Sequence, residues 1–483
     1  MTVSSQRSGP DLDAAHDGAP GGAPLDTAGL RDWIDGRVIG PEDEGYDAAR
    51  QVMPGHIDRR PALIVQVKTV EDVRRVVRTA RETGLELAVR SGGHSASGHG
   101  TTDGGIVLDL RDMNALDIDA DARTAWAEAG LTAGQVTKAT SERGLAIGFG
   151  DTGSVGIGGI TTGGGVGYLG RKHGLTIDNL LAAEVVTAEG EILRADAATN
   201  PDLFWAIRGG GGNFGVATRF LYRLVELPQI VGGMLFLPAT AETIQRFIEL
   251  ADEAPDEVST IANVMPCPPM PMVDEAWHGK LVIFGLLCFA GDAAAGEDAL
   301  RPFRDLAKLG GLEAPIADLV QPMTLAGMYG PEGEDADYRP TAVATTLFLD
   351  KVDGETAQTI MARLEALPDA PMRVAQLRVL GGAIARVPVD ATAYAHRNSR
   401  IMVNLAAFYE NEQERAARQA WLDEFASAIR QSDQGAYVNF VGDEGESRVH
   451  AAYPGATWDR LAGIKRRYDP TNLFRLNQNV PPA

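Results

Sequence analysis

The residues best placed to do chemistry are a histidine and the glycine-rich segments that accompany it. Residues 91–95 read SGGHS, with His94 in fourth place. In the second glycine-rich segment, between Gly148 and Gly170, eleven of 23 residues are glycine. The third glycine-rich segment, residues 208–215, reads RGGGGNFG. Apolar residues are interleaved with these glycines, which argues against a flexible linker. We therefore expect backbone that approaches another group closely, with amide N–H groups free to bind anionic or polar atoms.

Two stretches match the pattern GxGxxG, but their surroundings argue against a dinucleotide site of the Rossmann type. The matches are Gly165-x-Gly167-x-x-Gly170 and Gly210-x-Gly212-x-x-Gly215. A Rossmann site needs a strand before the glycines, a helix after them and an acidic residue about 20 positions later. The order around the second match is reversed, because residues 204–207 look helical and residues 216–224 look like a strand.

The elements that position His94 can be predicted from the residues that precede it. Residues 62–67 (ALIVQV) form an apolar run typical of a strand. Thr69 with Asp72 three residues later predicts a capped helix, whose apolar face extends toward Gly84. A second strand follows over residues 85–89. This strand–helix–strand unit ends at the RSGGHS stretch, where the backbone must turn sharply.

Beyond about residue 230 the pattern changes to alternating apolar stretches separated by helices. We expect strands over 281–289, 342–349 and 400–408, and helices over 241–253 and 413–431. This arrangement predicts an antiparallel sheet covered by helices, the α+β pattern. The acidic, glycine-rich stretch GPEGEDAD (330–337) is expected to be an exposed loop.

Length and composition set broader limits. At 483 residues the chain is long for one core, so two domains are expected. The first 26 residues lack the apolar region of a signal peptide and are expected to form a disordered tail. A net charge of -22 disfavours nucleic acid and anionic membranes as partners. No apolar run approaches the ~20 residues of a membrane span, so we expect a cytoplasmic protein.

The cysteines and histidines show no pattern of a disulfide framework or a metal site. Cys267 and Cys288 are the only cysteines, and neither belongs to a CxxC pair. The eight histidines contain no HExxH or HxxxH pair. We therefore expect no metal.

Four motifs, in order along the chain, together resemble the berberine-bridge-enzyme-like FAD-linked oxidases, which are flavoproteins of the vanillyl-alcohol-oxidase type. They are RSGGHSASGHG (90–100), the second glycine-rich segment with its continuation (153–192), NPDLFWAIRGGGGNFGV (200–216) and YDPTNLFRLNQNVPP (468–482). The resemblance implies an α+β, two-domain PCMH-type FAD-binding fold with an inserted substrate domain. We accordingly expect FAD-binding parts over 27–230 and 436–483, and a substrate domain over 231–435.

Carried over residue by residue, the resemblance implies FAD attached covalently through His94, with a non-covalently held FAD as the alternative. The linkage needs a neutral imidazole nitrogen that attacks the 8α-methyl carbon of the flavin, and the alkylated flavin is a stronger oxidant. Thr152 stands where some relatives carry a second, cysteinyl attachment, and a hydroxyl cannot do thiolate chemistry. One covalent bond is therefore expected. Further residues are placed against the cofactor: Arg90, Ser91, Gly92, Gly93, Ser95, Thr152, Gly153, Val155, Gly158, Gly159, Thr161, Gly215, Val216, Asn477 and Asn479.

Several of these assignments have a structural alternative. The amides of residues 91–95 are suited to hold a pyrophosphate, whereas Arg90 either adds charge there or only caps the end of its strand. Val155 matches a position whose size governs oxygen access in the family, with valine permissive, and plain packing is the alternative. Asn477 and Asn479 match positions that face the flavin, where amides can bond the pyrimidine edge.

The catalytic base is left open by the sequence. Many relatives carry a tyrosine as the last residue of a YxNY stretch, but here the stretch reads YVNF, and Phe440 cannot accept a proton. Candidate substitutes are Tyr437, Tyr453, Asn404 and His396. Asn404 is expected to project from one face of a strand. For each tyrosine, the alternative is a packed aromatic ring with a satisfied hydroxyl.

The resemblance implies an oxidase that passes a hydride from a small alcohol, amine or secondary metabolite to FAD, with molecular oxygen as acceptor and hydrogen peroxide as product. A flavin dehydrogenase with another acceptor is the alternative, and Phe440 also keeps open a non-redox, cyclase-type flavoprotein. A single flavin attachment favours secondary-metabolite or small aromatic substrates over carbohydrates. The sequence identifies neither the substrate nor the oligomeric state, and a homodimer is compatible with it.

Overall fold

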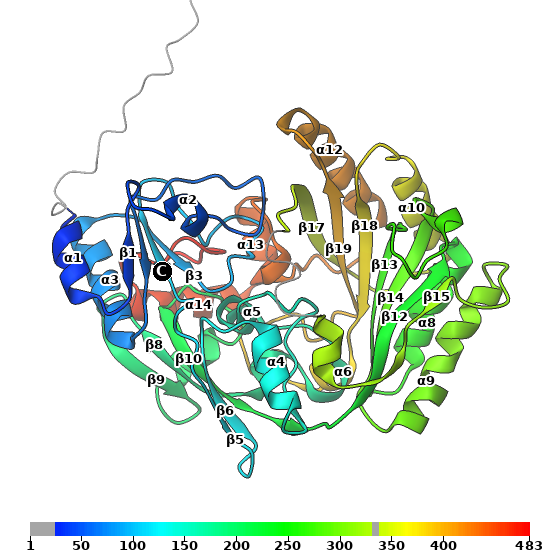
Figure 1. Cartoon of the computed structure of the whole chain (residues 1–483), viewed down its shortest axis with the longest axis horizontal. Coiled ribbons are helices and arrows are strands. Elements are labelled where there is room, and N and C mark those ends of the chain that lie inside the picture. Colours follow the sequence, from blue (N-terminus) through cyan, green and yellow to red (C-terminus); the bar gives the residue numbers. More distant parts are fainter. Residues whose placement is uncertain (1–24, 331–337) are drawn as a thin grey trace, which may run out of the picture.

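The computed structural model describes residues 25–330 and 338–483. Figure 1 shows two lobes side by side, the first built from both ends of the chain and the second from its middle. The tail expected over residues 1–26 lies outside the described residues except for its last two, and the acidic loop expected over 330–337 does so except for Gly330. Asp26 caps helix α1 (Thr27–Trp33) by accepting a hydrogen bond from the Gly29 amide.

A four-stranded sheet in the first lobe contains the predicted strand–helix–strand unit. Its strands, in spatial order, are β1 (Arg37–Ile39), β2 (Leu63–Gln66), β4 (Ile106–Asp109) and β3 (Leu87–Arg90). Helix α3 (Val70–Thr83) begins with a capping box between Thr69 and Asp72 and ends at Gly84, whose φ of 70° is left-handed. The prediction of this helix is confirmed, and β3 delivers the chain directly to residues 91–95.

A five-stranded antiparallel sheet forms the second layer of this lobe. In spatial order its strands are β5 (Leu116–Asp119), β6 (Thr124–Glu128), β10 (Val216–Arg223), β8 (Leu180–Val186) and β9 (Ile192–Asp196). Helix α7 (Pro201–Ala206) precedes the third glycine-rich segment and β10 follows it. This helix–glycine–strand order confirms that the GxGxxG match at residues 210–215 is not a Rossmann site.

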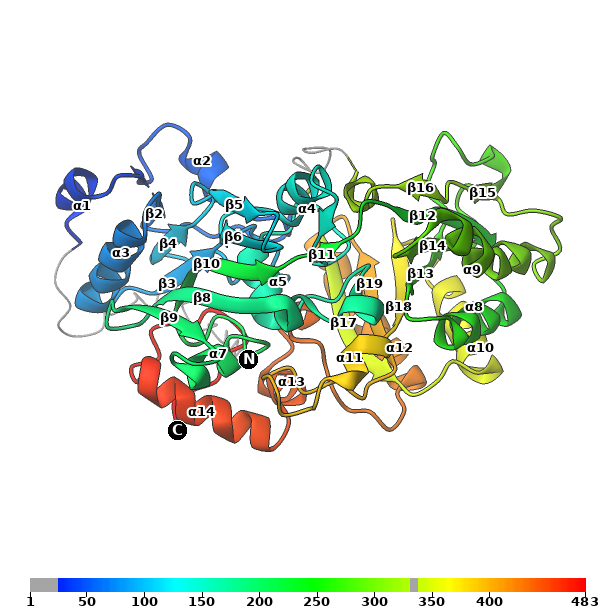
Figure 2. The ribbon, with the colours of Figure 1, turned by 90° about the horizontal axis from the view of Figure 1, so that it is seen from below.

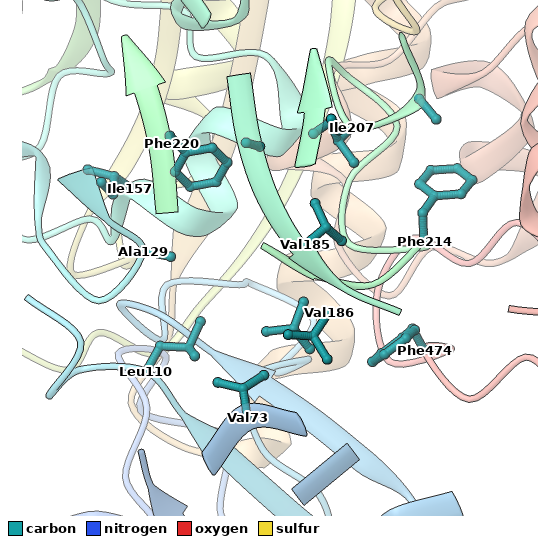
Figure 3. Packing of buried hydrophobic residues seen from close by; sticks show 14 of the residues in the cluster. Val73, Leu110, Ala129, Ile157, Val185, Val186, Ile207, Phe214, Phe220 and Phe474 are labelled. Atoms are coloured by element: carbon teal, nitrogen blue, oxygen red, sulfur yellow. The ribbon is translucent and has the colours of Figure 1, made fainter. Parts of the chain in front are cut away.

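Apolar side chains from both sheets and from the C-terminal segment pack into one core (Figure 3). Val73 of α3 lies beneath Val185 and Val186 of β8, and Phe474 from the chain end packs near Val186. Shorter elements complete the lobe: α2 (Tyr46–Ala49), α4 (Ala133–Ser141), β7 (Leu145–Ala146), α5 (Ile157–Gly163), α6 (Gly170–His173), β11 (Val225–Glu226), α13 (Glu446–Ala452) and α14 (Ala456–Tyr468). Figure 2 shows α14 packed beside α7.

A buried ion pair fastens the C-terminal segment to the third glycine-rich segment. Lys465 and Asp469 lie 2.6 Å apart, and both side chains are fully buried. The Lys465 ammonium also donates to the carbonyl oxygens of Asn213 and Phe474, at 2.7 and 2.9 Å. The Asp469 carboxylate accepts from the amides of Leu473 and Phe474. Each charge is therefore compensated only while its partner is present.

We expect Asp469→Ala to destabilise the protein by about 3–5 kcal/mol, because it leaves a buried ammonium without a counter-charge. Urea unfolding of the full chain, followed by fluorescence, measures the effect. Asp298→Ala is the matched control, since Asp298 pairs with Arg301 on the surface, where an ion pair contributes little. Equal unfolding midpoints for the two variants would contradict the assignment.

The second lobe is a large antiparallel sheet covered by helices, as predicted. Its strands are β12 (Ile230–Pro238), β13 (Val258–Pro266), β14 (Leu281–Phe289), β15 (Ala317–Asp318), β16 (Gln321–Met323), β17 (Ala342–Leu349), β18 (Arg373–Val379) and β19 (Ile401–Phe408). The covering helices are α8 (Ala241–Glu253), α9 (Ala293–Asp305), α10 (Gly354–Glu365) and α12 (Glu412–Ile429), whereas α11 (Gly382–Arg386) contacts α6. Figure 1 shows α8, α9 and α10 on the side of the sheet away from the first lobe.

Side chains alternate across this sheet, so its two faces have different surroundings. Leu377 and Val403 pack into the core beneath the helices. Arg378 and Asn404, each the next residue along its strand, face the first lobe instead. The face toward the first lobe therefore supplies polar side chains to the contact between the lobes.

Two features are absent from the described ranges of the chain. No helix in them is long and apolar enough to cross a bilayer. Nor do the same residues bring three His, Cys, Asp or Glu side chains together as metal ligands.

Candidate functional site

A cavity of about 470 Å³ lies where the first lobe meets the sheet of the second. Its wall combines the turn after β3, the second and third glycine-rich segments, strands β17 to β19 and the C-terminal segment. Most of the residues predicted to form a site line it: Arg90, Ser91, Gly92, Gly93, His94, Ser95, Thr152, Val155, Gly158, Gly159, Gly215, Val216, Asn404, Tyr437, Tyr453 and Asn477. The fold thus brings together residues that lie almost 400 positions apart in the sequence.

Four predicted site residues do not line the cavity. The Thr161 hydroxyl is buried in a hydrogen bond of 2.7 Å with that of Tyr222, on the core side of α5. Gly153 packs against Gly134 and Tyr329. These two residues therefore face the core rather than the cavity, because the segment alternates between the two.

His396 and Asn479 are the other two predicted site residues that do not line the cavity. A ring nitrogen of His396 is bonded to the Ala452 carbonyl at 3.0 Å, and the ring stacks on Phe348. His396 therefore packs between α13 of the first lobe and β17 of the second, and it does not line the cavity. Gln478 lies in the wall where Asn479 was expected, and its amide donates to the Val441 carbonyl at 2.8 Å.

The glycines allow two chain segments to touch. A Cβ atom at Gly92 would lie 2.2 Å from the Gly156 nitrogen, and a Cβ at Gly156 would lie equally close to the Gly92 nitrogen. Ser91 locks the contact, since its hydroxyl donates to the Ala129 carbonyl and accepts from the Gly158 amide. The turn that carries His94 is therefore held against the second glycine-rich segment.

Other glycines border open space in the cavity. A Cβ added at Gly159 or Gly212 would meet no protein atom within 4 Å, although both residues line the wall. The amides of Gly92 and Gly93 donate to no other group of the described chain. This combination of open space and available N–H donors suits a ligand with anionic or polar atoms.

Arg90 lies in the wall but is occupied by structural contacts. Its guanidinium pairs with Asp109 at 2.7 Å and donates to the carbonyls of Ala49 and Gln51. Burial lowers the pKa of Arg90, and Asp109 opposes that effect. Of the two alternatives for Arg90, these contacts support the cap at the end of its strand.

Arg378 and Asp151 form a charged pair in the wall that sequence reasoning missed. Their side chains are 2.6 Å apart, although 227 residues separate them. Gln376 accepts from the same guanidinium, and the Val166 carbonyl accepts from it at 3.1 Å. The guanidinium also lies 5.2 Å from the ring centre of Phe440. No local signal reveals the pair, because it forms only when the lobes meet.

The hydroxyl oxygen of Tyr437 is held by two N–H donors. It accepts hydrogen bonds from the Gly165 amide at 3.0 Å and from the side-chain amide of Asn439 at 2.9 Å. Burial raises the pKa of Tyr437, while these two bonds and the charge of Arg378 act in the opposite direction. The two bonds and the charge of Arg378 therefore offset the effect of burial only in part, so the pKa stays above its ordinary value. The hydroxyl proton has no acceptor among the described residues.

Three further polar atoms in the wall have no hydrogen-bond partner within the described part of the chain. They are the Tyr453 hydroxyl and the side-chain carbonyl oxygens of Asn404 and Asn477. Burial raises the pKa of Tyr453 well above its ordinary value, so its hydroxyl stays protonated. Since buried polar groups are normally paired, these atoms indicate a ligand with complementary donors and acceptors.

His99, five residues after His94, is a second histidine of the wall that sequence reasoning did not single out. Burial lowers its pKa to about 4, and the charge of Arg59 adds to the effect. The side chain is therefore neutral at physiological pH. The repeated pattern GGH and GHG in residues 92–100 was the signal that could have identified it.

No thiol lines the cavity. Thr152 occupies the wall, and its hydroxyl is 3.4 Å from the Asp151 carboxylate. Both cysteines, Cys267 and Cys288, are buried in the second lobe. Burial raises the pKa of Cys288 to about 12, which leaves it an unreactive thiol.

The sequence matches two protein families. Residues 61–196 match the FAD binding domain family, and residues 436–481 match the family described as berberine and berberine like. The (R)-6-hydroxynicotine oxidase of Paenarthrobacter nicotinovorans is 30% identical, over 93% of this chain and 97% of that protein. The FAD-linked oxidoreductase YvdP of Bacillus subtilis is 31% identical, over 93% and 99%.

Solved structures share the arrangement of the two lobes. The crystal structure of 6-hydroxy-D-nicotine oxidase from Arthrobacter nicotinovorans superposes with a TM-score of 0.80 and 28% identity, covering 93% of this chain and 98% of the other.

Proposed function

The chain belongs to the berberine-bridge-enzyme-like FAD-linked oxidoreductases, and from this premise we propose that it oxidises a small alcohol, amine or secondary metabolite. We place FAD and substrate in the cavity between the two lobes, with molecular oxygen as electron acceptor and hydrogen peroxide as product. The observation that carries it is the composition of the wall. Glycine-rich backbone forms one side, and the polar face of a sheet forms the other.

The residues of the wall fit FAD. The free amides of Gly92 and Gly93 suit a pyrophosphate, and the open space at Gly159 and Gly212 accepts a ligand without clashes. The unpartnered oxygen of Asn477 suits a donor such as a ring N–H. When bound, FAD supplies the acceptor for a hydride and the route for two electrons to oxygen.

We further propose that His94 attaches the FAD covalently and that it is the single attachment. His94 lies in the cavity wall, on a turn that Ser91 fixes against the second glycine-rich segment. A fixed turn presents the imidazole in one orientation, which is the protein's contribution to bond formation. A second attachment lacks a nucleophile, because Thr152 offers a hydroxyl and both thiols lie elsewhere.

We propose that Tyr437 accepts the proton, in place of the tyrosine that many relatives carry where this chain has Phe440. Two N–H donors and the nearby Arg378 stabilise the charge that a deprotonated oxygen would carry. Asn404 faces the same cavity and has an unpartnered oxygen, so it is proposed to orient the substrate through a donor group. His396 is excluded by its position.

Val155 is proposed to leave oxygen a path to the flavin. Its backbone is fixed, because its carbonyl accepts from the Ala133 amide at 2.9 Å, and its side chain lines the cavity. We expect Val155→Leu to slow reoxidation of the reduced flavin by about tenfold or more, equivalent to about 1.4 kcal/mol of barrier. Stopped-flow mixing of reduced enzyme with oxygenated buffer measures this rate. An unchanged rate of reoxidation would show that Val155 serves only in packing.

The experiment that separates an oxidase from a dehydrogenase uses the wild-type holoenzyme. A panel of alcohols, amines, phenols and sugars is screened for bleaching of the flavin spectrum without air, and the reduced enzyme is then mixed with oxygen. Rapid recovery of the spectrum with formation of hydrogen peroxide supports the oxidase. Reoxidation slower than turnover with an artificial acceptor would favour the dehydrogenase, and no bleaching by any compound would favour a non-redox flavoprotein.

A further inference from the structure

Arg171 carries a buried positive charge without a carboxylate partner. It lies on α6, at the end of the second glycine-rich segment, and only 6% of its surface is exposed. Its guanidinium donates to the carbonyls of Leu380 and Ala254, at 2.6 and 2.8 Å, so it joins the first lobe to the second. Its Nε has no hydrogen-bond partner in the described chain. Buried charges are normally paired, so this arrangement calls for a counter-charge.

The acidic residues near Arg171 are engaged elsewhere. Asp256 and Asp252 act on it from a distance, and each is ion-paired with a more exposed arginine, Arg386 and Arg400 respectively. Glu257 in turn lies within ion-pair distance of Lys172. Among the described residues, then, no carboxylate is left to neutralise Arg171 directly.

Arg171 is one of the residues that line a small cavity of about 20 Å³. It lies between α6 and strands β13 and β18, and Ser259 and Arg378 also line it. Ser259 is buried on the face of the sheet that meets the first lobe, and no other group of the described chain forms a hydrogen bond with its hydroxyl. A space of this size holds one water molecule or one ion of similar size.

The charges around this small cavity favour an anion over water. Two arginines line it and no acidic residue does, and the charge of Arg378 is already matched by Asp151 in the large cavity. The remaining net charge is that of Arg171. An anion there also gives an acceptor to the hydroxyl of Ser259.

We propose that a monatomic, chloride-sized anion binds in this small cavity between Arg171, Arg378 and Ser259 and stabilises the docking of the two lobes. The site adjoins the large cavity, with which it shares Val166 and Arg378, but it does not depend on the proposed function. Polyatomic anions such as sulfate are too large for about 20 Å³ and are excluded as the natural occupant.

The direct test is a crystal of the wild-type holoenzyme grown or soaked in sodium bromide, with data collected at the bromine absorption edge. We expect an anomalous peak in the cavity, beside Arg171 and Ser259. An ordinary water with no anomalous signal would overturn the proposal.

Thermal unfolding provides a second test in solution. At fixed ionic strength, replacing gluconate by chloride or bromide should raise Tm by about 2 °C, because a ligand that binds only the folded state stabilises it. Arg171→Met should abolish this halide dependence, and Ser259→Ala should weaken it. Lys172→Met, at the neighbouring and more exposed position, should retain it. A halide response that is equal in Arg171→Met and wild type, or absent from wild type, would contradict the site.

Discussion

Replacing His94 with alanine is expected to remove the covalent attachment while leaving FAD bound without it. The amides of Gly92 and Gly93 and the open space at Gly159 do not depend on the imidazole, so the cradle for the cofactor persists. Loss of the alkyl link makes the flavin less electron-poor, and its reduction potential should fall. A fall of about 60 mV lowers the equilibrium constant of a two-electron transfer about a hundredfold.

Dye-equilibration titration of the His94→Ala holoenzyme measures the potential, and stopped flow measures its reduction by substrate. His99→Ala is the matched control, because His99 lies five residues further along the chain and is the second histidine of the same cavity wall. We expect His99→Ala to retain the covalent flavin. Retention of the covalent flavin in His94→Ala, or its loss only in His99→Ala, would show that the attachment was assigned to the wrong residue.

Tyr437→Phe is expected to slow reduction of the flavin by substrate by about 10² to 10⁴-fold, the usual contribution of a proton acceptor. The substitution keeps the ring, which packs against Tyr394 and Phe440, and removes only the hydroxyl. Covalent flavin content should therefore be unchanged, and the loss should fall on kcat more than on KM.

The pH dependence gives a readout that a structural role for Tyr437 would not alter. Burial raises the pKa of this phenol above its ordinary value of 10.0, so only a small fraction is deprotonated near neutral pH. That fraction rises as pH rises, so the rate of flavin reduction should increase about tenfold per pH unit below the pKa. This slope should disappear in Tyr437→Phe and persist in Tyr394→Phe, which alters a buried tyrosine outside the large cavity. Persistence of the slope in Tyr437→Phe would assign the base to another group.

The elements around the site could be predicted because their signals are local. Thr69 and Asp72, three residues apart, predict the start of a helix, and the capping box forms between them. The alternating run over 281–289 coincides with β14, because one face of the strand packs in the core beneath the helices. Likewise, the glycine density of residues 148–170 correctly indicated close backbone approach, which the contact of Gly92 with Gly156 shows.

The parts of the site that were missed depend on contacts between distant segments. Asp151 is adjacent to a predicted residue, yet its partner Arg378 lies in the other lobe. His396 was misplaced for the same reason, since only the folded chain shows that Ala452 accepts its hydrogen bond. Thr161 illustrates a different limit, because one position along a short helix decides whether a side chain meets the cavity or Tyr222 in the core.

The intact mass of the purified wild-type protein after denaturation tests covalent attachment of FAD through His94 most directly. We predict that the mass exceeds that of the polypeptide by one FAD. Flavin absorbance should remain with the protein and map to the peptide that contains His94. Flavin released completely by denaturation would contradict covalent attachment, and absence of flavin from the native protein as well would contradict the placement of FAD in this cavity.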